Sequence, residues 1–170
     1  MFDESLDYSR LMEFANESRL VDSEYHGIEH WKQVESNGIL LASRTRADIS
    51  VVRLFAIFHD CKRMDDGHDA EHGLRGAEFA RVSREKGIFQ LDDSRFEKLY
   101  HACRFHTEER TSGDVTIDTC YDADRLDLGR VGFRLDPSKM ATATGKKLAR
   151  MSVDEQVSVF RMREWLDRFR

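Results

Sequence analysis

Histidines and aspartates are the residues of this chain whose types and spacing could do chemistry. All seven histidines lie between positions 26 and 106, and none occurs after that. Carboxylates accompany them, since Asp60 follows His59 directly and the segment YDADRLDLG, residues 121–129, contains three aspartates. Imidazole and carboxylate ligands together suit Mn, Fe, Co, Ni, Zn or Mg, and they do not suit copper(I). The residue types therefore predict a site for a divalent metal ion.

The pair His59-Asp60 stands at the end of an apolar run, LFAIF, at residues 54–58. Consecutive side chains on a helix diverge by about 100°, so His59 and Asp60 converge on one ion only near a helix end. A buried aspartate without a partner would be costly or protonated, and a divalent ion removes that cost. We therefore expect a buried helix, capped by Asp48 and ending at the metal site.

The elements that must position these residues are helices. Most segments place apolar residues at helical spacing, and the single proline, Pro137, interrupts little. Residues 65–73 and 106–118 are polar and are predicted as loops, and 132–147 has no clear pattern. The sequence predicts an all-α fold, a compact bundle of about six or seven helices in one domain over residues 1–170. The expected helices span residues 4–18, 27–44, 49–61, 71–86, 92–106 and 117–130, with another after a capping box at Ser152 and Glu155.

The order His30, His59-Asp60, Asp124 resembles the HD-domain superfamily of metal-dependent phosphohydrolases. The resemblance covers about residues 22–135 and is carried by HGIEHWKQV at 26–34, LFAIFHDCKR at 54–63 and YDADRLDLG at 121–129. It implies an HD-domain-like bundle in which His30, His59, Asp60 and Asp124 bind the metal. Asp122 is a competing choice for the last ligand, and the sequence leaves the two aspartates open.

Some members of this superfamily have two further histidine ligands and bind a second ion. His72, in EHGLRGAEFA, and His106, in ACRFHTEE, are similar to these ligands in position. Asp60 would then bridge the two ions. The resemblance therefore implies one or two divalent ions per chain.

The function that the resemblance implies is hydrolysis of a phosphate ester by metal-activated water. Nucleotides are the first substrate class to test. Related sequences often have a lysine three residues after the paired aspartate, where this chain has Arg63 with Lys62 beside it, so these two cations are the candidates for binding phosphate. Asp127 or Glu29 is a candidate for accepting a proton. The predicted catalytic set is Asp60, Arg63, Lys62 and Asp127, and His26 is expected to orient a ligand or touch the substrate.

Two other functions fit the same residues. A few HD proteins use paired iron to activate oxygen, and the six ligands named above would support that chemistry as well. Alternatively, the site belongs to a non-catalytic module that binds a metal or senses a ligand. Metal analysis and phosphate-release assays separate the three hypotheses.

The composition of the chain argues against several classes of binding partner. The formal net charge of −5 argues against a surface for duplex nucleic acid, but not against a small phosphorylated ligand in a local pocket. The three cysteines contain no C-x-x-C pair, which argues against a disulfide framework or a zinc knuckle. No apolar run approaches the roughly 20 residues of a membrane span, and the first residues do not read as a signal peptide. We expect a cytoplasmic protein with a small phosphorylated substrate, no membrane partner and an oligomeric state that the sequence leaves open.

Overall fold

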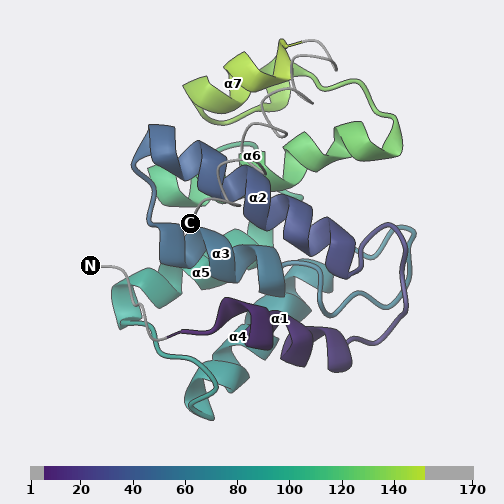
Figure 1. Cartoon of the computed structure of the whole chain (residues 1–170), viewed down its shortest axis with the longest axis vertical. Coiled ribbons are helices and arrows are strands. Elements are labelled where there is room, and N and C mark those ends of the chain that lie inside the picture. Colours follow the sequence, from purple (N-terminus) through teal and green to yellow (C-terminus); the bar gives the residue numbers. More distant parts are fainter. Residues whose placement is uncertain (1–5, 152–170) are drawn as a thin grey trace, which may run out of the picture.

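The computed structural model describes residues 6–151, in which helices are joined by loops (Figure 1). It contains seven α-helices and two short 3-10 helices, and residues 6–151 contain no strand. This confirms the predicted all-α bundle. The elements are α1 (Tyr8–Glu17), α2 (Ile28–Thr45), α3 (Ile49–Phe58), α4 (His72–Glu85), α5 (Asp93–Phe105), α6 (Val115–Asp127), η1 (Leu128–Val131), η2 (Pro137–Lys139) and α7 (Ala143–Ala149).

Helix α3 forms the centre of the bundle, and α1, α2, α4, α5 and α6 all pack against it. Its Leu54, Phe55, Ile57 and Phe58 are completely buried, which stabilises the fold by about 1.5–3 kcal/mol for each side chain. The Asp48 carboxylate accepts hydrogen bonds from the first free backbone amides of the helix, which confirms the predicted N-cap. The apolar run therefore anchors the segment that carries His59 and Asp60.

Two helix pairs flank α3. Helices α2 and α6 lie together on one side, as Figure 1 shows, and α4 packs against α5. Glycines allow close approach in the second pair, because a Cβ atom at Gly73 would overlap the carbonyl of Cys103 and one at Gly76 would overlap the carbonyl of Phe58. Helix α4 therefore sits against the ends of both α3 and α5, which brings Asp60, His72 and His106 together.

Several expected boundaries differ from the structure. Helix α6 begins at Val115, because Asp114 caps it by accepting hydrogen bonds from the amides of Thr116 and Ile117, so the end of the predicted loop 106–118 is helical. The unassigned segment 132–147 contains η2 and most of α7. The helix expected after Ser152 lies outside the described residues. No helix within residues 6–151 combines the length and apolar character that crossing a bilayer requires.

Candidate metal centre

His30 on α2 and His59 at the end of α3 face each other. His59 Nδ1 lies 3.1 Å from the backbone carbonyl oxygens of Phe55 and Ala56, and His30 Nδ1 lies 2.6 Å from Asp127 Oδ2. These oxygens accept hydrogen bonds, so both Nδ1 atoms carry a proton and both Nε2 atoms present a lone pair when the rings are neutral. The two Nε2 atoms lie only 3.1 Å apart, where lone pairs repel unless a cation or a proton lies between them.

His72, the first residue of α4, and His106, just after α5, repeat this arrangement. His72 Nδ1 donates to the carbonyl oxygen of Asp69, and His106 Nδ1 donates to that of Cys103 at 2.7 Å. Their Nε2 atoms lie 3.0 Å apart, and both residues are buried. Four imidazoles from four parts of the chain therefore direct their Nε2 atoms to one region.

Asp60 lies between the two histidine pairs. Its Oδ2 is 3.6 Å from His30 Nε2, whereas its Oδ1 is 3.2 Å from His72 Nε2 and 3.6 Å from His106 Nε2. The Oδ1 atom is buried and has no hydrogen-bond partner among residues 6–151. Because an unpaired buried carboxylate oxygen is costly, this atom marks a position that favours a cation. The Oδ2 atom of Asp60 thus faces the pair that contains His30, and its Oδ1 atom faces the pair of His72 and His106.

Asp124, on α6, completes the first group. Its Oδ1 lies 3.3 Å from His30 Nε2 and 3.6 Å from His59 Nε2. Burial raises the pKa of Asp60 and of Asp124, but the neighbouring imidazoles, His59 foremost for Asp60 and His30 for Asp124, outweigh burial and hold both pKa values well below their usual range. Burial lowers the pKa of His30, yet its contacts with Asp124 and Asp127 outweigh this effect and raise it to about 10. Both aspartates are therefore ionised, and in the metal-free protein a proton on His30 balances part of their charge.

The donor set fits divalent ions. His30, His59 and Asp124 form one group with ligand atoms close together, and Asp60, His72 and His106 form a second. Nitrogen ligands at right angles around an ion lie about 3 Å apart for metal–nitrogen bonds of about 2.1 Å, which matches the separations within both histidine pairs. Nitrogen and carboxylate oxygen donors suit borderline or hard divalent ions. The residues present could hold two ions, with Asp60 facing both.

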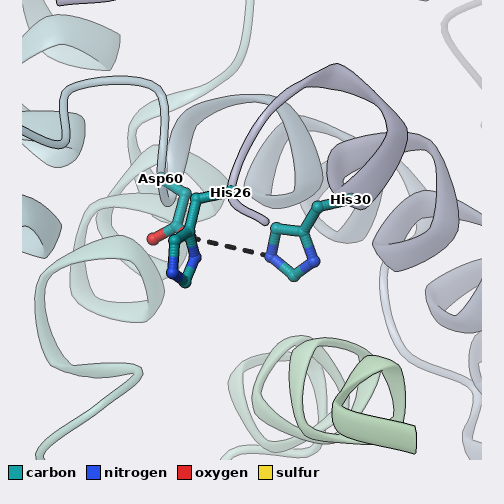
Figure 2. A group of neighbouring side chains, drawn as sticks. All are labelled: His26, His30 and Asp60. Atoms are coloured by element: carbon teal, nitrogen blue, oxygen red, sulfur yellow. Dashed lines mark hydrogen bonds and ion pairs between the residues drawn. The ribbon is translucent and has the colours of Figure 1, made fainter. Parts of the chain in front are cut away.

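His26 adds a fifth imidazole, in a different orientation. Figure 2 shows His26, His30 and Asp60, with the His30 ring directed toward the other two side chains. His26 Nδ1 lies 2.9 Å from Asp60 Oδ2, and its backbone amide donates to Ser23 Oγ at 2.8 Å. His26 precedes α2 and is half-buried, so it steadies the Asp60 carboxylate from the solvent side. With His30 and Asp60 it forms a third group that could hold a metal ion.

One of the comparisons with known proteins, the one with solved structures, found a similar fold. No protein-family model matches the chain, and no curated protein sequence matches it. Its structure is similar to a crystal structure described as a predicted HD superfamily hydrolase from an uncultured Thermotogales bacterium. The two share 27% sequence identity with a TM-score of 0.65, over 95% of this chain and 88% of that chain. The chain is therefore HD-domain-like in fold and in sequence. This confirms the family that the motifs indicated.

In this HD-domain protein the two candidate aspartates of α6 have different surroundings. Asp122 is completely buried, and its carboxylate accepts hydrogen bonds from the backbone amides of Ala141 and Thr142 and from the Thr142 hydroxyl, at 2.7–2.8 Å. It therefore fastens the start of α7 to α6. Asp124 faces His30 and His59. Asp124 could therefore hold a metal ion together with these histidines, whereas Asp122 supports the packing of α7.

Asp127, expected to accept a proton, lies behind the HD-domain metal centre. Besides contacting His30 Nδ1, its Oδ2 atom lies 3.0 Å from Arg130 Nε. Arg130 also donates to the carbonyl oxygen of Tyr25, so it links η1 to the loop before α2. Asp127 thus supports the centre by orienting His30. The sequence pattern did not predict the role of Arg130, which holds the Asp127 carboxylate in place. Their i,i+3 spacing on successive helical turns was the available signal.

The two cations predicted to bind phosphate, Arg63 and Lys62, lie in different surroundings. Arg63 is buried, donates to the carbonyl oxygens of Asp65 and Gly67, and directs its third guanidinium nitrogen toward Asp60 Oδ1 at 3.6 Å. Lys62 instead donates to the Ser18 carbonyl and lies over the ring of Phe79. These contacts of Lys62 do not support the phosphate-binding role expected for it.

Glu29 is far more exposed than any donor of the centre. Its side chain is 74% exposed and pairs with Lys32 at 2.7 Å, on the surface of α2. This placement does not support the proton-accepting role considered for Glu29.

Two other histidines also lie away from the centre. His68 is exposed in the loop after α3, and His101 pairs with Glu109 on α5.

Proposed function

We propose that this protein is a metal-dependent phosphohydrolase that cleaves a small phosphorylated substrate, with nucleotides as the first class to test. One observation carries the proposal, namely the convergence of four Nε2 atoms on the ionised Asp60, whose Oδ1 has no hydrogen-bond partner in the described residues. The solved relative described as a predicted HD superfamily hydrolase supports the same reaction class. The residues that would hold the ions are His30, His59, Asp60, Asp124, His72 and His106.

Bound divalent ions would lower the pKa of water toward neutrality and polarise a phosphoryl oxygen. The protein's own contribution begins with the rigid orientation of the donors. Backbone carbonyls fix the Nδ1 protons of His59, His72 and His106, and Asp127 fixes that of His30. Such partners hold each ring in one tautomer and one direction. The donors therefore need little rearrangement, which favours catalysis by preorganisation.

Arg63 would offset the charge that develops on the phosphoryl group. Two of its guanidinium nitrogens are held by backbone carbonyls, and the third lies beside Asp60 Oδ1. Arginine is always protonated and donates several hydrogen bonds in a fixed plane, which suits phosphate oxygens. Since the carbonyls hold this side chain in place, it would meet a phosphate at the second group of donors without losing further rotamer freedom.

The test is a panel of nucleotides and general phosphoesters assayed with Mn²⁺, Co²⁺, Ni²⁺, Zn²⁺, Mg²⁺ and Fe²⁺, with phosphate release as the readout. Wild type should turn over at least one substrate in a metal-dependent manner. Asp60→Ala should abolish turnover while far-UV circular dichroism shows nearly unchanged helical content. The matched control is Asp22→Ala, because this aspartate is 89% exposed and within residues 6–151 pairs only with Arg19. Turnover retained by Asp60→Ala would contradict the proposal.

The same purified protein separates the two alternatives. Two irons per chain with a visible charge-transfer band, and no phosphate release, would favour oxygen activation. A metal-dependent rise in melting temperature without turnover across the panel would favour a non-catalytic binding module.

A further inference from the structure

A second feature of the fold could bind an anion, and it lies outside the metal centre. A surface cavity of about 470 Å³ opens between the segment after α5 and the segment that contains η2 and α7. Cationic side chains from both segments line it, and Pro137 contributes apolar surface. None of the lining residues belongs to the metal-binding groups. The cations are Arg110, Lys146 and Arg150.

The charge of this cavity is unbalanced. Within residues 6–151, no acidic residue lines it and no carboxylate pairs with the side chain of Arg110, Lys146 or Arg150. Most arginines elsewhere in the described bundle do have such partners, for example Arg53 with Glu35 at 2.6 Å. Three cations around one cavity repel each other in the absence of an anion. The cavity therefore favours a negatively charged occupant.

The surrounding sequence has the same bias. Residues 128–151 contain six lysines and arginines and one aspartate, although the whole chain has a net charge of −5. That aspartate, Asp136, accepts hydrogen bonds from the amide and hydroxyl of Ser138. On the other wall, the hydroxyl of Thr111 donates to Asp118. The hydroxyls of Ser138 and Thr111 are thus engaged already, and the three cations must balance the charge of a ligand.

The walls of the cavity are held in place by buried groups. The guanidinium of Arg125 donates to the carbonyl oxygens of Arg110 at 2.8 Å and Lys139 at 3.0 Å, which ties one wall to the other. Asp122 holds the amide of Ala141 at 2.7 Å, and a Cβ atom at Gly145 would overlap its carboxylate, so α7 lies close against α6. The backbone around the cavity is therefore fixed before any ligand binds, which lowers the entropic cost of binding.

We propose that this cavity is a binding site for a small molecule carrying two or more negative charges on phosphate groups. A volume of this size accommodates a ligand the size of a diphosphate ester. The three cations meet the phosphates, and the surface of Pro137 contacts the organic part. The proposal does not depend on the reaction at the metal centre.

The test is calorimetric titration of pyrophosphate into the full chain, as purified and in the Asp124→Asn variant. Wild type and Asp124→Asn should share one binding component that weakens as NaCl is raised. The double variant Arg110→Ala/Lys146→Ala should bind at this component about tenfold more weakly. Lys147→Ala is the matched control, since Lys147 neighbours Lys146 on α7 but does not line the cavity, and it should bind as wild type.

Three results would overturn the proposal. These are wild-type affinity in the double variant, loss of all pyrophosphate binding in Asp124→Asn, and inorganic phosphate binding as tightly as pyrophosphate. Circular dichroism of each variant shows whether helical content is retained. Should the double variant lose helical content, the single charge reversal Lys146→Glu replaces it, with the same expected loss of affinity.

Discussion

Gly76 offers a way to disturb the second group of metal donors without altering any donor. It lies on α4, one turn after His72, where this helix meets the end of α3. A Cβ atom at this position would lie 2.2 Å from the carbonyl oxygen of Phe58 and 3.0 Å from that of His59. Both neighbours are backbone atoms, so no side chain can rotate away. Gly76→Ala therefore forces α4 and α3 apart.

The size of this effect follows from the overlap. Ordinary contact requires about 3.2 Å, so α4 must move by about 1 Å, which carries His72 with it. Metal–ligand distances tolerate deviations of only about 0.2 Å, so the shift should disrupt ligation by His72 Nε2, now 3.2 Å from Asp60 Oδ1. Overpacking of this kind costs about 3 kcal/mol, which corresponds to a fall of about 6–12 °C in melting temperature for a chain of this size.

Metal content after dialysis and a thermal melt check this prediction. Gly76→Ala should lose one ion of the two while it keeps the ion near His30. The control is Gly129→Ala, because a Cβ atom there would meet its nearest neighbour, Leu135, at an ordinary 3.9 Å. Gly129→Ala should keep both ions and its melting temperature. A Gly76→Ala variant with two ions and a wild-type melting temperature would refute the role of close helix contact in shaping the centre.

Three further predictions concern single residues. Asp124→Asn should lower metal content, whereas Asp122→Asn should keep the metal and lower stability by about 1–3 kcal/mol, as measured by denaturant unfolding; metal lost by Asp122→Asn and retained by Asp124→Asn would contradict the assignment of these aspartates. His30 has a pKa of about 10 without metal, so an ion must displace its proton, and metal affinity should rise by up to about tenfold per pH unit between about pH 6 and pH 9 in chelator competition. An affinity independent of pH would show that His30 is not a ligand. His26→Asn should keep the metal yet slow hydrolysis of bis(p-nitrophenyl) phosphate by about 10–100-fold, and unchanged turnover would remove His26 from the mechanism.

Local signals were sufficient to predict much of the bundle. The apolar run at 54–58 and the cap at Asp48 indicated α3, and both depend only on neighbouring residues. The start of α6 also had a local signal, the Asp114 cap, but the polar residues around it resembled a loop. The segment 132–147 had only a weak local signal, the Thr142 cap, whose hydroxyl accepts from the amide of Gly145, and the start of its helix depends also on the distant carboxylate of Asp122.

The candidate site was predictable in its residue types and order, and less so in the roles of neighbouring residues. Lys62 and Arg63 are neighbouring cations in the sequence, and both were predicted to bind phosphate. The turn after α3 buries Arg63 beside Asp60 and places Lys62 over the ring of Phe79. The choice between Asp122 and Asp124 likewise depends on what each side of α6 faces. Such choices need the packing of helices that are distant in the sequence.

The most direct test of the metal centre is an anomalous difference map from crystals grown with Mn²⁺. The structure predicts two peaks, one within bonding distance of each carboxylate oxygen of Asp60, the first also touching His30 and the second His72. A map with no peak beside Asp60, from protein shown to be folded, would contradict the assignment of these buried side chains as metal ligands.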